Sequence, residues 1–295
     1  MSRLEEALRR FNGSTSTPEL PQGQEAGVFE SPWALGQEGR SAVAAPSLDR
    51  PEAPPEPVSS SRFLDVASGE GLGSNWKQWL VSSDVDPTIV EQFRRLAAAL
   101  LHGQRDGRLK VIMVTSAVPG EGKTLTTLNI ALVLAESYRR RVLLIDADLR
   151  RPRLSEAANL TVTEGLGDVL KGTEDRKAAV TQLTDHLWFL PAGRPDPEPL
   201  SGLTSPRMQR LLEEAAERFE WVIVDTPPVT VAADAGLLGA LVDAVVLVVK
   251  AGQTPHPAVR QAIETLGRDR IFGVVLNGVD QQHQDEYSVY TPAER

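Results

Sequence analysis

The sequence predicts a doubly wound α/β domain, in which helices cover both faces of a mostly parallel sheet. Three observations lead to this fold class. Apolar runs without polar alternation recur along the chain, as is typical of strands that are buried on both faces. Segments with apolar residues at helical spacing separate these runs. The alternation extends from about residue 87 to residue 280, which suits one domain.

The predicted elements alternate strictly, beginning with a helix that Asp86 and Pro87 introduce. Each strand is a short run rich in Val, Ile or Leu, and each helix has apolar residues three or four positions apart. The expected helices are 88–101, 125–135, 165–170, 205–219, 232–241 and 257–266. The expected strands are 111–115, 141–146, 187–193, 221–225, 244–249 and 272–276. Right-handed crossovers place the loops after the strands along one edge of the sheet, so we expect residues that carry chemistry there.

The composition limits the classes of protein and of partner. A net charge of −9 over 295 residues argues against nucleic acid as the main partner. The chain has no cysteine, which excludes a disulfide framework and fits a reducing compartment. No apolar run approaches the roughly 18–20 residues of a membrane-spanning helix, and the N-terminus lacks the apolar core of a signal peptide. We therefore expect a cytoplasmic protein that reaches a membrane only through a partner.

Four segments are expected along the chain. Residues 1–62 are rich in Pro, Gly, Ser, Gln and Glu and are predicted to be disordered. A short amphipathic helix is expected within them at 3–11, as either a docking peptide or a frayed end. Residues 63–86 regain aromatic residues and are predicted to be a docking or linker segment at the domain edge. The folded domain is expected at 87–280, followed by a flexible tail at 281–295.

The loop after the predicted strand 111–115 has the pattern of a phosphate-binding P-loop. Backbone N–H groups of such a loop, and of the helix that follows it, bind phosphate. Gly120 and Gly122 permit positive φ angles. Lys123 would contact the β- and γ-phosphates, and the Thr124 hydroxyl would bind Mg²⁺. The expected nucleotide-binding residues of this segment are Pro119, Gly120, Glu121, Gly122, Lys123, Thr124 and Leu125.

Three carboxylates are expected beside this loop. Asp146 and Asp148 follow one predicted strand at alternating positions, and Asp225 ends another, ahead of Thr226-Pro227-Pro228. Mg²⁺ binds few carboxylates directly and keeps several waters, so the three acids could share direct and water-mediated contacts. One acid could act as a base or organise a water, and Asp225 has the place of a Walker B acid. The alternatives are a helix cap at Asp148 and a plain turn after Asp225.

Two further features stand out near the predicted site and at the end of the chain. The cluster Arg150-Arg151-Pro152-Arg153 follows the paired acids and could bind phosphates or an acidic or phosphorylated partner segment. Two of the three tyrosines, Tyr287 and Tyr290, lie in a tail without apolar periodicity. Because such a tail gives tyrosines no core to pack in, we interpret them as candidate phosphoacceptors.

Together these motifs resemble those of the bacterial tyrosine kinases, or BY-kinases, which are the autokinases of capsule and exopolysaccharide biosynthesis. Segments 115–124, 146–150 and 222–228 are similar to the Walker A, A′ and B motifs of that family. The resemblance implies a P-loop NTPase fold of the deviant-Walker, MinD-like superfamily. It also implies dependence on ATP and Mg²⁺, autophosphorylation of C-terminal tyrosines in a neighbouring subunit, ring-like homo-oligomers, and control of polysaccharide polymerisation and export.

The resemblance also assigns roles to residues. The implied catalytic residues are Lys123, Asp148, Asp225 and Asp146, the last as base for the tyrosine hydroxyl. The implied metal ligands are Thr124, Asp148 and Asp225, and Asn277 is similar in position to an adenine-contacting residue of related ATPases. The implied partners are a tyrosine phosphatase and a membrane-embedded activator of the chain-length-determinant type. This activator would hold the kinase at the cytoplasmic side of the inner membrane.

Two rival functions and two departures accompany this prediction. A partitioning or septum-positioning ATPase would carry an additional Lys at the position of Val118. A non-enzymatic scaffold of an export complex would bind nucleotide and form no phosphotyrosine. The P-loop has Ala117 where the general pattern begins with Gly. The Glu-x-x-Arg-x-x-Arg pattern of the family's oligomerisation helix begins at Glu91 and has Ala97 in place of its last Arg.

Overall fold

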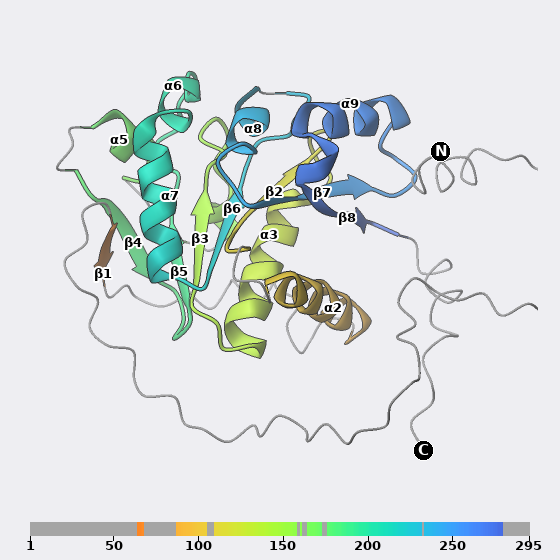
Figure 1. The fold of residues 1–295 in the computed structure, drawn as a ribbon, viewed down its shortest axis with the longest axis horizontal. Coiled ribbons are helices and arrows are strands. Elements are labelled where there is room, and N and C mark those ends of the chain that lie inside the picture. The colour runs from red at the N-terminus through yellow and green to blue at the C-terminus, as the bar shows by residue number, and fades with distance from the viewer. Residues whose placement is uncertain are drawn as a thin grey trace, which may run out of the picture. The chain divides into compact units, whose positions relative to one another are not determined.

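The fold is organised around a mostly parallel sheet, which has eight strands among the residues that the structure describes (Figure 1). The strand order is β1-β4-β5-β3-β6-β2-β7-β8. Neighbouring strands from β5 to β8 pair in parallel, whereas β4 runs antiparallel to β5 and parallel to β1. The strands are β1 (Leu64–Ala67), β2 (Val111–Ser116), β3 (Val142–Asp146), β4 (Ala178–Gln182), β5 (Leu187–Leu190), β6 (Trp221–Asp225), β7 (Ala244–Lys250) and β8 (Ile271–Asn277).

The computed structural model describes residues 64–67, 87–104, 109–157, 160, 164–172, 176–231 and 233–279. All of them belong to one structural unit, Glu56–Arg295. The predictions for residues 1–62 and for the tail 281–295, with its two tyrosines, lie outside the described residues. No helix within the described ranges combines the length and the apolar character needed to cross a membrane.

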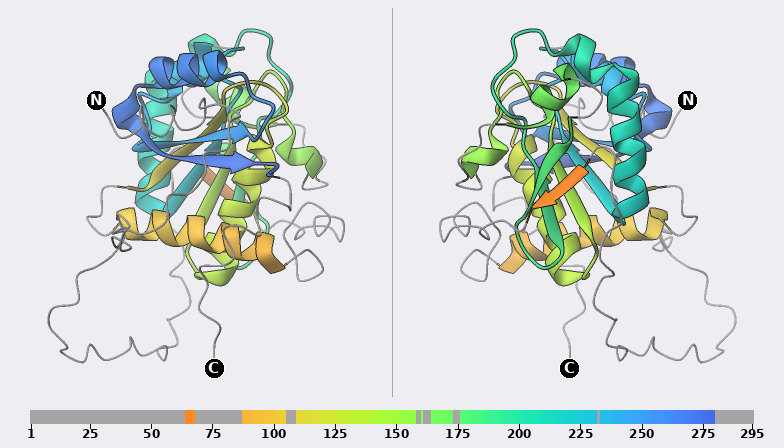
Figure 2. Two further views of the ribbon diagram at one scale, coloured as in Figure 1. Left: turned by 90° about the vertical axis from the view of Figure 1, so that its right-hand side faces the viewer. Right: turned by 90° about the vertical axis from the view of Figure 1, so that its left-hand side faces the viewer.

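Helices cover both faces of the sheet, as the figures show from three directions (Figure 1, Figure 2). One face carries α2 (Pro87–Gly103), α3 (Lys123–Leu132) with its π-helical continuation (Val133–Ser137), and α4 (Leu154–Ala157). The other carries α5 (Leu166–Lys171), α6 (Leu200–Leu203), α7 (Pro206–Arg218), α8 (Ala233–Leu238) and α9 (His256–Leu266), with a 3₁₀ turn at Arg268–Arg270. This arrangement confirms the predicted doubly wound α/β class.

The apolar runs form the central strands because both of their faces are buried. In β2, Met113 packs with the α7 side of the sheet, whereas Ile112 and Val114 pack with the α3 side. Strands β2, β3 and β6 are buried at every position. Burial on both faces therefore explains why these strands show no polar alternation in the sequence.

Two strands at one end of the sheet, the edge strand β1 and its neighbour β4, were not predicted. β4 has the sequence Ala-Ala-Val-Thr-Gln, and β1 has four residues from the segment 63–86, which was expected only to pack at the domain edge. Both are short, and β4 alternates between buried and exposed positions at its start. Such strands lack the long apolar run that marks a central strand. The expected helix 232–241 is also shorter, since α8 ends at Leu238, just before Gly239.

Helix α2 contains Ala97, which stands where the expected oligomerisation pattern has its last Arg. Ala97 is fully buried in the apolar cluster on this face of the sheet. Glu91 pairs instead with Arg95, at 3.6 Å, on the exposed side of the helix. An arginine at position 97 would have to bury its guanidinium, which is costly without a partner.

The sheet register places the predicted acids together. Asp146, at the end of β3, is the direct neighbour of Asp225, at the end of β6. On the other side of β6, Val114 of β2 pairs with Asp225, and the P-loop begins a few residues further on. The carboxyl ends of three adjacent parallel strands therefore define one site.

Candidate active site

The loop between β2 and α3 has the backbone conformation of a phosphate-binding loop. Gly120 and Gly122 have φ angles of 83° and 87°, in the left-handed region that favours glycine. A Cβ on Gly122 would lie 2.1 Å from Nδ2 of Asn277, so a side chain there would displace the Asn277 amide. A Cβ on Gly120 would meet nothing within 4 Å. The positive φ favours glycine at both positions, and the close approach of Asn277 adds a second reason at Gly122.

Glu121 holds this loop against the ends of two strands. Its side chain is only 2% exposed. The carboxylate accepts hydrogen bonds from the backbone N–H groups of Val118 (2.7 Å) and Lys250 (3.1 Å), and from the hydroxyl of Thr254. The carbonyl oxygen of Glu121 accepts a hydrogen bond of 2.8 Å from Nδ2 of Asn277. Glu121, predicted to bind nucleotide, thus directs its side chain into the protein and shapes the loop.

The predicted P-loop cation and two of the acids are in direct contact. The ammonium group of Lys123 lies 3.0 Å from Oδ2 of Asp148 and 3.3 Å from Oδ2 of Asp225. The hydroxyl of Thr124 donates to the same oxygen of Asp225 at 2.8 Å. The other oxygen of Asp225 accepts a bond of 3.0 Å from the hydroxyl of Thr127. Three side chains of the first turns of α3 thus converge on one carboxylate at the end of β6.

Asp146 is held beside this group by the backbone. It is fully buried, whereas Asp148 is 6% exposed. The N–H groups of Asp148 and Leu154 each donate to one of its carboxylate oxygens at 3.2 Å. The structure therefore brings Asp146, Asp148 and Asp225 together around the end of Lys123, as the sequence predicted.

Burial and neighbouring charges shift the pKa values in this group. Burial raises the pKa of Asp146 well above its ordinary value, and the carboxylate of Asp225 raises it further. The pKa of Asp225 is also raised, chiefly by burial, although Lys123 opposes this effect. Burial alone would lower the pKa of Lys123, but the carboxylates of Asp225 and Asp148 outweigh it and raise the pKa. The site thus keeps Lys123 protonated, and the charge of Lys123 offsets only part of the negative charge of the neighbouring acids.

Arg150, which follows the paired acids in the sequence, connects the loop after β3 to neighbouring segments. Its Nε lies 2.8 Å from the carboxylate of Asp234, which is 1% exposed and lies in the first turn of α8. Its NH1 donates to the carbonyl oxygen of Pro197 at 2.6 Å. The pKa of Arg150 is raised because its guanidinium is hydrogen-bonded to Asp234. Arg150 therefore ties the loop after β3 to the start of α8 and to the loop that contains Pro197.

Sequence reasoning missed several residues of this site. Thr127 lies one helical turn after Thr124, and that spacing was the available signal. Asp234 and the inward role of Glu121 had no local signal, because their partners are 84 and 129 positions away. The Asn277 amide, predicted to lie near adenine, donates to the P-loop through Nδ2 and accepts from the N–H of Gly278 through Oδ1.

The residues present fit a Mg²⁺–nucleotide site. The loop has two positive-φ glycines, and the Thr124 hydroxyl, Asp225 and Asp148 supply the hard oxygen ligands that Mg²⁺ prefers. Among the described residues, no three His, Asp or Glu side chains are arranged to hold a metal ion by themselves. Mg²⁺ in phosphate sites is commonly bound by one or two carboxylates together with substrate phosphates and waters.

The fold and this site define a P-loop nucleotide-binding domain. Residues 112–293 match the family model described as the CobQ/CobB/MinD/ParA nucleotide binding domain. The chain is 37% identical over 203 residues to the tyrosine-protein kinase YwqD of Bacillus subtilis, covering 68% of this chain and 85% of that relative. The chain therefore belongs to the bacterial tyrosine kinase family, which confirms the family predicted from the motifs.

Other relatives extend this comparison. The succinoglycan biosynthesis transport protein ExoP of Rhizobium meliloti is 33% identical over 214 residues, covering 70% of this chain and 27% of ExoP. The tyrosine-protein kinase wzc of Salmonella typhimurium is 27% identical over 256 residues, covering 85% of this chain and 34% of that relative. The chain thus spans about a third or less of these two relatives. The solved kinase domain of Escherichia coli tyrosine kinase ETK superposes with a TM-score of 0.61 at 31% identity, covering 65% of this chain and 76% of that domain.

Proposed function

We propose that this chain is an ATP-dependent protein-tyrosine autokinase that transfers the γ-phosphate of ATP to tyrosines of its own C-terminal tail. The observation that carries the proposal is the contact of Lys123 with both Asp148 and Asp225, beside the buried Asp146. Membership of the bacterial tyrosine kinase family supports the same reaction. In this proposal, residues 87–280 form the kinase domain and residues 281–295 the acceptor tail.

Binding of the nucleotide depends on residues of the P-loop and the first turn of α3. The backbone N–H groups of Gly120, Gly122 and their neighbours bind the phosphates, and Lys123 moves from the carboxylates to the phosphate oxygens. Thr124, Asp225 and Asp148 would hold Mg²⁺, which would neutralise phosphate charge at this site. Asn277 contacts the adenine end of the nucleotide, or it stabilises the P-loop through its hydrogen bond to the carbonyl oxygen of Glu121.

Transfer requires an acceptor hydroxyl close to the paired acids. The tyrosine oxygen attacks the γ-phosphorus, the bond from that phosphorus to the bridging oxygen of ADP breaks, and the hydroxyl proton passes to Asp146. A raised pKa suits Asp146 to this role, because a base with a pKa nearer to neutral holds the proton more readily. Asp148, which is slightly exposed, orients the incoming hydroxyl and the metal.

The acceptors in this proposal are Tyr287 and Tyr290. By analogy with relatives named for succinoglycan biosynthesis transport and for tyrosine kinase activity, the reaction regulates polysaccharide polymerisation and export. The chain acts in the cytoplasm, held at the inner membrane by a membrane-embedded activator of the chain-length-determinant type. A tyrosine phosphatase reverses the modification, and homo-oligomers present one subunit's tail to another.

The test is phosphotyrosine analysis of the purified chain after incubation with ATP and Mg²⁺, with and without the cytoplasmic segment of the activator. Mass spectrometry should find phosphate on Tyr287 or Tyr290, and Lys123→Met should abolish it. ATP hydrolysis without phosphotyrosine in either condition would point instead to an ATPase switch. Nucleotide binding without hydrolysis or phosphotyrosine would point to a scaffold.

A further inference from the structure

Two neighbouring loops flank the paired acids on the side opposite the P-loop. One follows β3 and contains Arg151 and Arg153, and the other follows β5 and contains Arg194. Because β3 lies between β5 and β6, and β2 lies beyond β6, these loops and the P-loop approach the acids from opposite sides. A nucleotide bound to the P-loop would lie on the β2 side of the acids. The tyrosine that accepts the phosphate would then approach from the β3–β5 side.

The two loops are joined to each other near the acids. The backbone N–H of Asp196 donates to the carbonyl oxygen of Leu149 at 2.8 Å. NH1 of Arg150 donates to the carbonyl oxygen of Pro197 at 2.6 Å. Residues on either loop therefore have a fixed relation to Asp148, which immediately precedes Leu149.

Three arginines of these loops are available to a ligand. Arg151, Arg153 and Arg194 are exposed, and the structure records no ion pair for them within the described ranges. Arg150 differs, because Asp234 occupies its guanidinium at 2.8 Å. We call Arg151, Arg153 and Arg194 the acceptor-side basic surface.

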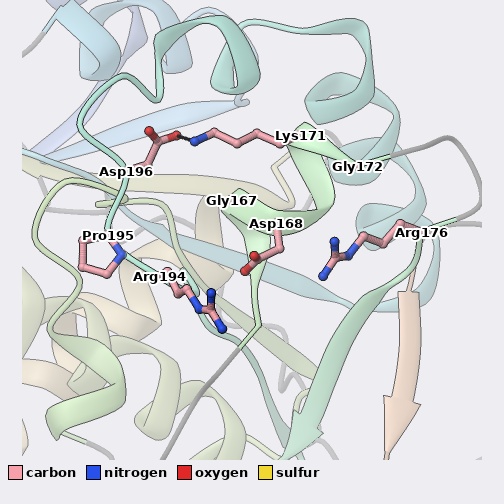
Figure 3. Close-up of a pocket in the computed structure, with 8 residues that line it drawn as sticks. All are labelled: Gly167, Asp168, Lys171, Gly172, Arg176, Arg194, Pro195 and Asp196. Atoms are coloured by element: carbon pink, nitrogen blue, oxygen red, sulfur yellow. Dashed lines mark ion pairs between the residues drawn. The ribbon is translucent and has the colours of Figure 1, made fainter.

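Arg194 also lines a pocket of about 280 Å³ at the end of α5 (Figure 3). The figure shows the ion pair of Lys171 with Asp196, at 2.7 Å, on one side of this pocket, and Arg194 with Arg176 and Asp168 on the other. Lys171 thus balances the charge of Asp196, and Asp168 accepts a bond of 2.9 Å from the N–H of Gly165. Arg194 is left as the cation that can bind an incoming carboxylate.

We propose, building on the autokinase function above, that the acceptor-side basic surface binds the acidic pair Asp285-Glu286 and thereby selects Tyr287 as the first tyrosine to be phosphorylated. The acidic pair directly precedes Tyr287, whereas Ser288 and Val289 precede Tyr290. Guanidinium groups bind carboxylates in two-pronged hydrogen bonds that fix orientation as well as charge. Carboxylates held on the β3–β5 side bring the adjacent tyrosine hydroxyl to Asp146 and Asp148.

The experiment supplies the tail in trans as a synthetic peptide of residues 281–295. Phosphorylation of this peptide is measured with the wild-type chain and with the triple variant Arg151→Gln, Arg153→Gln and Arg194→Gln. The matched control removes three exposed arginines elsewhere: Arg139→Gln and Arg141→Gln, before β3 at the opposite edge of the sheet, and Arg260→Gln on α9. A second peptide carries Asp285→Asn and Glu286→Gln.

The triple variant should raise the KM for the wild-type peptide roughly tenfold, by more than it lowers kcat, and should weaken the preference for Tyr287. The control should leave the KM unchanged. The substituted peptide should show a raised KM with the wild-type chain and no further rise with the triple variant, because the two changes remove the same contacts. Equal KM values for the triple variant and the control would overturn the proposal.

Binding measured without turnover separates this proposal from the autokinase function. A fluorescent form of the peptide is titrated into the Lys123→Met chain, and its anisotropy is followed with and without the three arginine substitutions. Binding that depends on the arginines, with no phosphotyrosine in the wild-type chain, would retain the docking surface and reject the kinase. If the peptide is phosphorylated but its binding does not change when the three arginines are substituted, the kinase function stands and the docking surface is rejected.

Discussion

Lys123 and Asp148 link the P-loop to the loop after β3, with 3.0 Å between the ammonium nitrogen and Oδ2 of the carboxylate. Asp225 contacts the same ammonium at 3.3 Å. One cation therefore balances two buried acids, one in the loop after β3 and one at the end of β6. Several predictions about stability and binding depend on this balance, since removing the cation leaves two carboxylates without compensation.

Replacing Lys123 with Met should lower both nucleotide affinity and stability. We expect affinity to fall roughly a hundredfold, or about 2.7 kcal/mol, and the free energy of unfolding to fall by about 2 kcal/mol. Fluorescent-nucleotide titration and urea denaturation measure the two effects. Lys110→Met is the control. Lys110 directly precedes β2, at the end of the strand away from the P-loop, and its ammonium group donates to the carbonyl oxygen of Ala216. Unchanged affinity in Lys123→Met would contradict the P-loop assignment.

The two P-loop glycines should differ in their tolerance of alanine. Gly120→Ala carries the cost of a positive φ, about 1–2 kcal/mol, and has no neighbour for its Cβ within 4 Å. Gly122→Ala carries a similar φ cost and also a clash with Asn277 at 2.1 Å. Nucleotide affinity and thermal stability should therefore fall further in Gly122→Ala. Equal losses in the two variants would show that Asn277 does not define the loop.

The ion pair of Arg150 with Asp234 should contribute more than an exposed pair. Arg150→Gln leaves a buried carboxylate without its guanidinium, and we expect a loss of about 1–3 kcal/mol in the free energy of unfolding. The partial exposure of Arg150 keeps this value below that of a fully buried pair. Arg95→Gln, which breaks the exposed pair with Glu91, should cost about 0.5 kcal/mol or less. The comparison fails if denaturation gives the same loss for both.

The raised pKa of Asp146 predicts the direction of two pH effects. Burial and Asp225 keep its carboxyl protonated to a higher pH than an exposed aspartate. Phosphorylation should therefore increase as pH rises through this raised pKa, because the base must be ionised. Stability has the opposite sign: the contribution of the protonated carboxyl is complete below the ordinary pKa and is lost as pH rises through the raised one.

Rate and denaturation series across the acidic and neutral pH range measure both slopes. Asp146→Asn should remove the activity and this part of the pH dependence of stability. Its matched control is Asp243→Asn, since Asp243 accepts from the N–H groups of Lys110 and Val111 outside the site. A stability slope that persists unchanged in Asp146→Asn would contradict the assignment.

The central strands and the three acids could be predicted because each depends on a contiguous run of residues. Asp146 and Asp225 end apolar strands, and parallel pairing brings such ends to one edge. Strands β1 and β4, at one end of the sheet, could not be predicted in the same way, since they are short and only partly apolar. The place of β1 depends on pairing with β4, more than a hundred residues away in the sequence, which no local pattern records.

The contacts that support the site also could not be predicted from the sequence. Glu121 was assigned to the nucleotide because it lies within the P-loop motif, yet its carboxylate binds the backbone of Lys250. Arg150 was read as part of a basic cluster, yet it pairs with Asp234. In both cases the partner comes from a distant segment that the fold brings alongside.

The most direct test of the account is a crystal structure of the chain with Mg²⁺ and a non-hydrolysable ATP analogue. The account predicts that the phosphates occupy the loop of Gly120 and Gly122, that Lys123 contacts them, and that Mg²⁺ lies against Thr124 and Asp225. A nucleotide bound elsewhere, or a metal remote from these residues, would contradict it.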